Sequence, residues 1–541
     1  MAKTSALLLV SAMLAVLAPV NGLWPQPRNL TTGSSALKLS GGFEISIASS
    51  LYNAPQDLQQ AISRSHGFLQ TDKLERLVVG RGDVDKPALT KAKTLSQLTV
   101  SLDKGATVQS ITAEAQKPIE ERDEGYVLDV PADGSGATLT ANSTLGLFRG
   151  LTTFGQLWYQ SDSTTYTIEA PIHIVDSPAY PYRGYMLDTA RNYFPVTDIK
   201  RAIDGMSWVK INQFHWHVVD SQSFPLEVPG FEELAQKGAY ASSMVYTAQD
   251  VQDIVEYAGA RGIDVLVEID TPGHTSAISK SHPEHIACAE STPWASFANE
   301  PPAGQLRLAS NATAEFTANL LVAVSKLFPS SMIKTQASLN ATGLNFTQAL
   351  TAFTQQSHNA LIKAGKTPVV WEEMILSFNV TLAPEVIALV WISSDDVKGV
   401  AESGHKLIHA ASDYFYLDCG GGGWVGANPD GNSWCDPFKT WQYSYSFDPV
   451  ANLTADEAKL VLGGQHLLWT EQTGPSNLDP ITWPRAASSA ELFWTGPGLN
   501  ISTVLPRLHD LSFRFQQRGI QTIPLQPLWC ALRPGVCDLT A

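Results

Sequence analysis

The stretch Gln213–Asp220 constrains the fold of this chain more than any other. It reads QFHWHVVD, an apolar and aromatic run typical of a buried strand, and it ends on a carboxylate. A parallel β/α barrel requires such strands, because its interior is packed and its functional groups lie at the mouth. We therefore expect His215 and His217 to fill the core and Asp220 to be the functional group.

Segments of similar composition recur from residue 182 onward and alternate with helical segments, near Thr197–Lys210 and Thr247–Arg261. The other strand-like segments are Tyr182–Thr189, Asp264–Asp270, Pro368–Met374, Val386–Ile392, Lys406–Asp418 and His466–Glu471. This alternation predicts an α/β fold, a TIM barrel of the (β/α)8 type. The strands number seven, and the interval from Asp270 to Pro368 has room for two units but no convincing strand. The fourth barrel strand is therefore expected to be deleted.

Ahead of the barrel, residues 23–176 predict a small α+β domain. The β-like runs are Leu74–Val79, Ser96–Leu102 and Glu124–Val130, and Thr144–Gln160 has apolar residues at helical spacing. No catalytic groups gather here. Two prolines in VDSPAYPYRG mark the entry into the second domain, residues 177–541, which comprises the barrel and a C-terminal tail.

Composition and targeting signals indicate the secretory pathway. With 541 residues, 44% of them hydrophobic, the chain can bury a large core, and its formal charge of -16 is spread along the sequence, so nucleic acid is not an expected partner. Residues 1–22 resemble a secretory signal peptide, and no later segment is long and apolar enough to cross a bilayer. Eight Asn-x-Ser/Thr acceptors fit a glycoprotein. We expect a secreted protein, extracellular or vacuolar-lysosomal, that makes no membrane contact.

Five cysteines in an oxidising compartment predict disulfides. Cys530 and Cys537 enclose a short loop, and Cys419 and Cys435 bracket a glycine-rich one. These two pairs are the expected local disulfides, and they leave Cys288 without a mate.

Eight motifs, in order along the mature chain, carry a resemblance to a known family. They are PYRGYMLDTARNYFPV, HWHVVDSQSFPLE, VEIDTPGH, PPAGQL, VVWEE, SDYFYLDCGGGGW, LWTEQ and PLQPLWC. With them the chain resembles the β-N-acetylhexosaminidases, glycoside hydrolase family twenty, and looks closest to secreted fungal or similar members. The resemblance implies a small α+β domain followed by a barrel, as the strand pattern also indicates.

One motif of that family, a Gly-Gly-Asp-Glu sequence at the end of the fourth barrel strand, is absent. Its place corresponds to the junction of Met332 and Ile333. The resemblance also implies a Cys shortly after the motif, as a partner for the position of Cys288. A missing segment of about 20 residues, roughly a strand and its loop, accounts for the lost strand, the lost carboxylates and the unpaired Cys. We hypothesise an internal deletion from a splice or gene-prediction error, which sequencing of the transcript across this junction tests.

Cleavage of a glycosidic bond requires an acid that protonates the leaving oxygen and a group that stabilises the oxocarbenium-like transition state. A 2-acetamido sugar can use its own carbonyl oxygen as nucleophile, and the protein then supplies an acid, a carboxylate that orients the acetamido N–H, and an aromatic box. The resemblance implies retaining exo-hydrolysis of terminal non-reducing β-linked N-acetylglucosamine or N-acetylgalactosamine, from chitin oligomers or glycoconjugates. The missing Glu and Asp are the implied acid and orienting carboxylate. No metal or other cofactor is expected, since the scattered His and Cys show no ligand spacing.

The resemblance implies that the rest of the sugar site is present. Asp220 and His274 match a pair that holds the acid without touching the sugar, although His274 can equally be satisfied by a loop carbonyl. The implied substrate-binding residues are Arg183, Trp371, Trp391, Tyr416, Asp418, Trp469 and Glu471. Their structural alternatives are an ion pair for the Arg, core packing for each Trp, and ordinary strand-end polarity for the others.

Three functional interpretations stay open. The first is the enzyme, the second is an inactive glycan-binding paralogue that keeps the pocket without the acid, and the third is a truncated gene product whose barrel does not close. Replacement of the acid by a neighbouring carboxylate needs a raised pKa and a geometry held to a fraction of an ångström, and is not expected. The carboxylates considered are Glu268, Asp270, Glu372 and Glu373. Members of that family are often dimers, which allows a homodimer here.

Overall fold

The computed structural model describes residues 22–334, 346–418, 423–427, 429 and 438–539. The N-terminal domain is one mixed sheet covered by helices. Its strands follow the order β1-β2-β4-β3-β6-β5, and β1 (Asn29–Ile47) pairs antiparallel with β6 over its first half and parallel with β2 over its second. The other strands are β2 (Lys93–Leu102), β3 (Tyr126–Val130), β4 (Ala137–Ala141), β5 (Tyr159–Ser161) and β6 (Thr164–Asp176).

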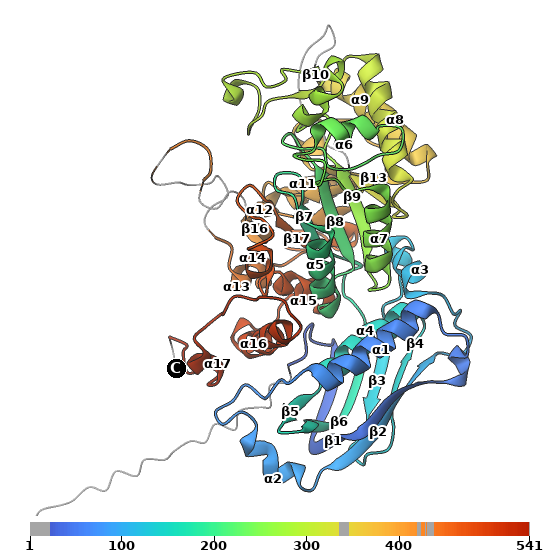
Figure 1. The fold of residues 1–541 in the computed structure, drawn as a ribbon, viewed down its shortest axis with the longest axis vertical. Coiled ribbons are helices and arrows are strands. Elements are labelled where there is room, and N and C mark those ends of the chain that lie inside the picture. Colours follow the sequence, from blue (N-terminus) through green and yellow to red (C-terminus); the bar gives the residue numbers. More distant parts are fainter. Residues whose placement is uncertain (1–21, 335–345, 419–422, 428, 430–437, 540–541) are drawn as a thin grey trace, which may run out of the picture.

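Two helices, α1 (Gln56–Thr71) and α4 (Thr144–Gln156), cover one face of this sheet (Figure 1). Helix α4 begins where the Ser143 side chain accepts a hydrogen bond from the backbone N–H of Gly146, and its apolar residues pack into the core of the sheet. The expected strand at Leu74–Val79 is wrong. That segment is irregular, because Leu74 and Leu77 are buried whereas Val79 is exposed, which is not the alternation of a paired strand.

Eight parallel strands form the second domain and close into a barrel, since β17 pairs with both β7 and β15. In barrel order they are β7 (Tyr182–Asp188), β8 (Gln213–Val219), β9 (Asp264–Ile269), β12 (Met332–Lys334), β13 (Thr367–Trp371), β14 (Ile387–Val390), β15 (Leu407–His409) and β17 (Val461–Leu468). The predicted TIM-barrel class is confirmed. Strands β7, β8 and β9 are buried at every position, which is why they read as continuous apolar runs.

The expectation that the fourth barrel strand is deleted is wrong. Strand β12 occupies the fourth place, parallel to β9 and β13, and all three of its residues are buried. Its sequence, Met-Ile-Lys, is too short and ends in too polar a residue to be recognised as a core strand. The expected strand Lys406–Asp418 is also two elements, β15 and β16 (Tyr416–Asp418), separated by α12 (Ser412–Phe415).

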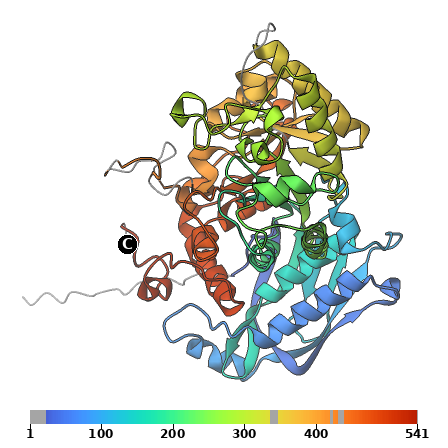
Figure 2. The ribbon, with the colours of Figure 1, turned by 45° about the horizontal axis from the view of Figure 1, so that its top comes forward.

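Helices surround the barrel on the outside (Figure 1 and Figure 2). The longer ones are α5 (Val196–Trp208), α7 (Ala248–Gly259), α8 (Asn311–Ser325), α9 (Phe346–Lys363), α15 (Ala487–Thr495) and α16 (Ile501–Gln517). The short helices of this domain are α6 (Glu232–Gly238), α10 (Glu373–Leu376), α11 (Val397–Glu402), α13 (Trp441–Tyr445), α14 (Leu478–Thr482) and α17 (Leu528–Ala531). Two further short helices, α2 (Lys86–Leu89) and α3 (Ile111–Ala115), belong to the N-terminal domain. Outside the barrel, β10 (Ile286–Ala287) pairs with β11 (Gln305–Leu306). Within the described residues, no helix combines the length and apolarity needed to cross a membrane.

Buried charges join the two domains. Glu124, in the N-terminal domain, accepts hydrogen bonds from Arg149 at 2.7 Å and from Arg183, at the start of β7, at 2.6 Å and 2.7 Å. Lys210 lies 3.2 Å from Asp176, and this pair is also buried. Because the N-terminal domain covers the strand starts, the carboxyl ends of the barrel strands form the opposite face, where barrel sites lie.

Candidate active site

Four aromatic rings form a closed square at the carboxyl ends of the last strands. Trp371 ends β13, Trp391 follows β14, Tyr416 begins β16 and Trp469 follows β17. Around the square, neighbouring ring centroids lie 6.0 Å, 6.5 Å, 6.1 Å and 6.3 Å apart. Two of the rings, Trp391 and Trp469, are partly exposed. This aromatic square offers flat apolar faces of the kind on which a sugar ring or an acetamido methyl packs.

A charged wall stands beside the square and is centred on Arg191, in the loop after β7. The Arg191 guanidinium lies 4.9 Å from the Trp469 ring centroid and contacts four carboxylates. These are Asp188 at 3.1 Å, Asp220 at 3.2 Å, Glu471 at 3.9 Å and Glu300, which accepts two hydrogen bonds. Burial disfavours the charge of Arg191, but these carboxylates raise its pKa well above the ordinary value.

Glu471 is the least satisfied member of this wall. Its Oε2 atom is buried and has no hydrogen-bond partner in the described part of the chain. Burial raises the pKa of Glu471 to about 7, although Arg191 opposes the shift. A buried acceptor of this kind at the edge of an aromatic site can receive a ligand hydroxyl. Asp418, the other predicted acceptor, accepts a hydrogen bond of 2.7 Å from the Thr473 hydroxyl.

A line of buried hydrogen bonds runs from the barrel interior to the mouth. Glu268 Oε2 lies 2.8 Å from both His215 Nε2 and His217 Nδ1, and His217 Nε2 lies 2.8 Å from Asp220 Oδ2. Asp220 Oδ2 in turn lies 3.1 Å from His274 Nδ1. His215 and His217 are fully buried, as expected, but they do not merely pack: His217 lies between Glu268 and Asp220, and His215 between Glu268 and the Gln465 amide.

His274 ends this line and is the part of it closest to solvent. Burial alone would lower the pKa of His274, but Asp220 and Asp270 raise it to about 10, so that the ring is a cation at neutral pH. Burial also raises the pKa of Asp270 to about 7. The side chain of His274 is 34% exposed, whereas Asp220 is inaccessible. The implied pair is therefore in contact, with the imidazolium facing the mouth.

The fourth strand contributes a cation, Lys334, one residue after the junction of Met332 and Ile333 at which the resemblance implies carboxylates. Lys334 Nζ donates a hydrogen bond of 2.6 Å to Glu268 and lies 2.9 Å from the Trp371 ring centroid. Burial lowers the pKa of Lys334 to about 8, with Glu268 opposing the shift. Glu373, after β13, accepts a hydrogen bond of 2.8 Å from Trp391 Nε1, and burial raises its pKa. The neighbouring Glu372 instead accepts two backbone N–H groups, which anchors it structurally.

Comparison with known proteins assigns this site to a family. The profile of the glycosyl hydrolase family 20 catalytic domain matches residues 180–497, and a profile described as beta-acetyl hexosaminidase like matches residues 23–157. The chain belongs to glycosyl hydrolase family 20. The predicted family and enzyme class, a glycoside hydrolase, are thereby confirmed.

Relatives of this family 20 chain match it over nearly its whole length. A beta-hexosaminidase of Arthroderma benhamiae is 31% identical, covering 98% of this chain and 99% of the relative. A chitooligosaccharidolytic beta-N-acetylglucosaminidase of Ostrinia furnacalis is 32% identical, covering 87% of this chain and 86% of the relative. The solved structure of the family 20 β-N-acetylhexosaminidase from Streptomyces coelicolor A3(2) superposes with a TM-score of 0.73 at 24% identity, covering 94% of this chain and 99% of that chain, which supports the fold.

In this family 20 barrel the predicted Arg183 is not at the mouth. It begins β7, at the opposite end of the strand, and its donors are taken by Glu124 and by the backbone carbonyls of Tyr180 and Lys210. The structural ion pair, which the sequence left as the alternative, is what the fold contains. Arg191, eight residues further on, holds the position that sequence analysis gave to Arg183.

Sequence reasoning missed Arg191 and Glu300 as members of the site. Arg191 lies in the motif PYRGYMLDTARNYFPV, in the loop that follows β7. A charged residue just after a barrel strand is expected at the mouth, and this position could have identified Arg191. Glu300 precedes β11 in the long connection after β9, and no local pattern marks it. The remaining implied residues, Trp371, Trp391, Tyr416 and Trp469, are brought together.

The predicted disulfide of Cys530 and Cys537 is present, with a Cα–Cα distance of 5.8 Å. Cys419 and Cys435 lie outside the described residues. Cys288 is exposed and free, as the odd count predicted.

Two groups of side chains at the mouth have the spacing of a metal site, but Arg191 already contacts carboxylates of both groups. His217, Asp220 and Asp270, and likewise Asp220, His274 and Glu300, are close enough to share an ion. The Arg191 guanidinium already lies against Asp220 and Glu300, however, and neutralises them.

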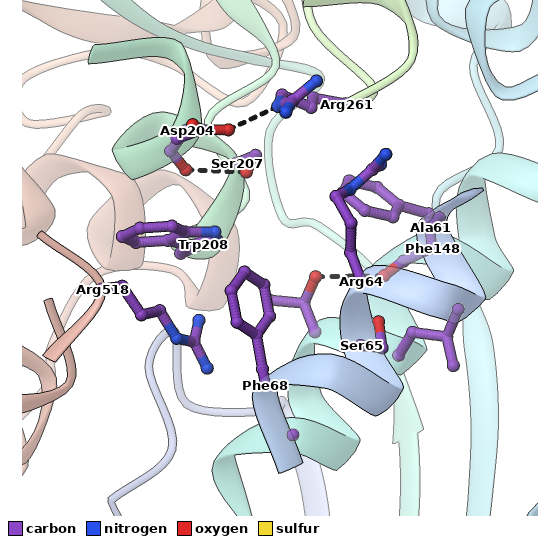
Figure 3. Close-up of a pocket in the computed structure, with 13 residues that line it drawn as sticks. Ala61, Arg64, Ser65, Phe68, Phe148, Asp204, Ser207, Trp208, Arg261 and Arg518 are labelled. Atoms are coloured by element: carbon purple, nitrogen blue, oxygen red, sulfur yellow. Dashed lines mark hydrogen bonds and ion pairs between the residues drawn. The ribbon is translucent and has the colours of Figure 1, made fainter. Parts of the chain in front are cut away.

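A separate cavity of about 40 Å³ lies between the two domains, at the end of the barrel away from the mouth (Figure 3). Figure 3 shows Arg64 and Phe68 from α1, Trp208 from α5, and Arg261 and Arg518 around it. Pockets for sugar-sized ligands measure about 300–1,000 Å³. This cavity has room for a few waters and is not a candidate sugar site.

Proposed function

We propose that the mouth of this barrel binds the terminal non-reducing N-acetylglucosamine or N-acetylgalactosamine of chitin oligomers and glycoconjugates. The reaction for which it is built is exo-hydrolysis of the β-linkage by a retaining, substrate-assisted mechanism. The observation that carries this proposal is the closed square of Trp371, Trp391, Tyr416 and Trp469 beside the charged wall. The names of the relatives, beta-hexosaminidase and chitooligosaccharidolytic beta-N-acetylglucosaminidase, support the same substrate class.

Each part of the mouth has a task in this reaction. The indole faces enclose the acetamido group, and the Tyr416 hydroxyl donates a hydrogen bond to its carbonyl oxygen, which holds that oxygen under the anomeric carbon. Arg191 and Glu471 take the outer hydroxyls with a donor fork and a buried acceptor. The His274 imidazolium and Asp220 stand ready to orient an acid beside them.

The proton donor is the part that this polypeptide lacks. No Asp or Glu occurs between Glu315 and Glu372, so neither β12 nor the connection that follows it carries a carboxylate. The match to the Arthroderma beta-hexosaminidase extends over 607 positions, more than the 541 residues of this chain, so that relative has segments without a counterpart here. The absence of a carboxylate from this stretch is what supports the deletion hypothesis, even though the barrel closes.

This observation favours a second candidate function for the 541-residue product, glycan binding without turnover. The two candidates separate in one experiment, in which the purified chain is given a chromogenic N-acetyl-β-glucosaminide and, in parallel, titrated with N-acetylglucosamine by calorimetry. Turnover that is lost in Glu373→Gln supports the enzyme, with Glu373 as a replacement acid. Saturable binding without turnover supports the glycan-binding protein.

The aromatic square supplies the control for either outcome. Trp391→Ala removes one side of the square and should weaken N-acetylglucosamine binding at least tenfold, whereas Trp529→Ala, on the exposed helix α17, should not change it. Equal affinity in both variants, or absence of binding in the folded wild type, would contradict the proposed site.

Restoring the missing segment tests the enzymatic proposal directly. In a chain that receives, between Met332 and Ile333, the Gly-Gly-Asp-Glu-containing strand and loop of a matched relative, the inserted strand would take the fourth place now held by β12. This chain should gain hydrolysis of the chromogenic substrate. The same insertion with Gly-Gly-Asn-Gln should bind sugar and not turn it over. A folded, sugar-binding insertion variant that stays inactive would count against the deletion.

We also propose that the chain is secreted and glycosylated. The apolar leader and eight Asn-x-Ser/Thr acceptors support this. Expression in a eukaryotic host should yield protein in the medium whose N-terminus lies after residue 22 and whose mass falls on treatment with an N-glycanase. Retention of the leader in an intracellular, unglycosylated product would contradict secretion.

A further inference from the structure

We propose that His282, Glu284 and His285 bind a divalent transition-metal cation of the Zn²⁺ class. The three residues lie in the connection between β9 and α8, on and beside the 3-10 turn η5 (Pro283–His285). His282 Nδ1 is 3.3 Å from Glu284 Oε1, and His285 Nε2 is 3.9 Å from the same oxygen. All three donor atoms lie within 4.8 Å of one another, in a group distinct from those that contain Asp220.

The turn itself creates the site. A 3-10 helix has three residues per turn, so side chains at positions i and i+3 lie above one another. His285 is the last residue of the turn, whereas His282 caps it with non-helical dihedrals (φ -128°, ψ 65°), and their ring centroids lie 6.0 Å apart. The His285 ring also stacks on Phe316 of α8, with centroids 4.3 Å apart and planes 29° from parallel, which fixes its orientation. The spacing of two histidines three residues apart is not specific enough in the sequence to mark a metal site, because many pairs with this spacing bind no ion.

The second nitrogen of each imidazole lies near a side chain of a neighbouring helix, and that of His285 is hydrogen-bonded. His285 Nδ1 lies 3.1 Å from the Thr313 hydroxyl, and His282 Nε2 lies 3.0 Å from Glu233 on α6. Without a cation, His282 Nδ1 donates its hydrogen to Glu284 Oε1. A bound cation would displace this hydrogen, and in the tautomer with hydrogens on the two remote nitrogens the lone pairs of His282 Nδ1 and His285 Nε2 would both face it. Partners that hold the remote N–H and leave the near nitrogen bare are the usual surroundings of metal-binding histidines.

A purely structural role explains less of this geometry. His282 Nε2 is buried, and its contact with Glu233 is not directed well enough to be a hydrogen bond. A metal on Nδ1 would fix the ring and increase the acidity of the opposite N–H, which strengthens its attraction to the carboxylate.

Two imidazoles and one carboxylate fit Zn²⁺ better than Ca²⁺ or Mg²⁺, which prefer oxygen ligands. Tetrahedral ligands about 2.0–2.2 Å from Zn²⁺ lie about 3.3–3.5 Å from one another. Glu284, whose side chain is 62% exposed, can move to adjust its own two separations. The two imidazole nitrogens lie within 4.8 Å of one another and would also have to approach to about 3.5 Å. Three protein ligands leave a fourth position for water. Through Glu233 on α6 and Thr313 on α8, the bound cation would link these two helices to the segment between β9 and α8.

The experiment uses the full chain, stripped of metal with a chelator and then titrated with Zn²⁺ in competition with a chromophoric chelator. We expect one saturable equivalent per chain, and Co²⁺ in its place should give the visible absorption of a tetrahedral site. Glu284→Gln and His282→Gln should each weaken binding at least tenfold, and Thr313→Val should weaken it about tenfold through His285. Glu290→Gln, similarly exposed in the same connection, is the matched control and should bind as the wild type does.

His285 is left unchanged because its ring packs on Phe316. A wild type without saturable Zn²⁺ binding would overturn the proposal. So would equal binding by the wild type and the double variant His282→Gln/Glu284→Gln, because the ion would then lie elsewhere, for instance at the mouth. As a second readout, Zn²⁺ should raise the thermal unfolding temperature of the wild type and of Glu290→Gln, and leave that of the double variant unchanged.

Discussion

At the scale of single residues, the positive charge of Arg191 decides the character of the mouth. Its guanidinium neutralises carboxylates that burial would otherwise favour in the protonated form, and one face of the guanidinium lies against the Trp469 ring. A planar guanidinium can bind carboxylates along its edges and stack on an aromatic ring with its face at the same time, and a lysine ammonium cannot.

Arg191→Lys should therefore lower the affinity for N-acetylglucosamine at least tenfold, about 1.4 kcal/mol or more. Arg183→Lys should leave that affinity within about twofold, since Arg183 contacts Glu124 at the other end of the barrel. Calorimetric titration of both variants makes the comparison, with circular dichroism to establish that each is folded. An Arg183 variant that folds but loses the sugar would restore Arg183 to the site.

Glu471 should make stability depend on pH. Its pKa rises from 4.5 in the unfolded chain to about 7 in the folded one, so the folded state holds the proton more tightly. The resulting stabilisation is complete below about pH 4.5 and is lost as the pH rises through about 7. Relative to Glu471→Gln, the free energy of unfolding of the wild type should fall over this range by up to about 3 kcal/mol.

Urea unfolding at pH 4.5 and pH 8, followed by tryptophan fluorescence, measures this difference. Glu402→Gln, whose carboxylate lies in water, serves as the control. Parallel behaviour of the wild type and Glu471→Gln across the pH range would show that the Glu471 pKa is not raised.

At the scale of elements, β12 shows how little sequence a barrel strand needs when its neighbours are long. Three residues suffice to close the ring between β9 and β13, and the third, Lys334, is paired with Glu268. Removal of one partner leaves the other buried and uncompensated.

Lys334→Met should accordingly destabilise the fold by about 3–5 kcal/mol. Glu268→Gln should do the same, and the double variant should recover part of the combined loss because no single charge is left behind. Chemical unfolding of the three variants gives the coupling energy. Strictly additive losses would mean that the pair contributes nothing as a pair.

The elements also explain what could be predicted from the sequence. Continuous apolar runs such as Gln213–Val219 can be recognised as strands in the sequence, because strands buried on both faces contain few polar residues. The aromatic square was foreseen from the resemblance to the family, and all four rings lie within expected strand segments. Strand β12 was not, since three residues carry no period, and Arg183 was misplaced because a motif does not tell which end of its strand faces the ligand.

At the scale of the whole molecule, the charges around Glu124 make the two domains one folding unit. Burial would raise the pKa of Glu124, but Arg183 and Arg149 hold it at about 2. Arg149 belongs to the same domain as Glu124 and Arg183 to the barrel, so separation of the domains would deprive Arg183 of its carboxylate and leave Glu124 with Arg149 alone.

Differential scanning calorimetry of the wild type should therefore show one transition. Glu124→Gln should lower its midpoint, at a cost of about 3–5 kcal/mol, and should split it in two as the domains lose their coupling. Glu121→Gln, exposed nearby, should behave as the wild type does. A single unshifted transition in Glu124→Gln would mean that apolar packing alone joins the domains.

The position of α16 has a consequence for how the polypeptide matures. This late helix and the residue after it reach back to the first domain, where Arg514 donates to the Gln156 and Trp158 carbonyls and Arg518 binds Asp72 (Figure 1 and Figure 2). The N-terminal domain is synthesised first, but part of its surface stays exposed until α16, near the end of the chain, has been synthesised. Premature stop codons upstream of Ile501 should yield nascent chains that chaperones retain and degrade, even though both domains have been translated almost completely.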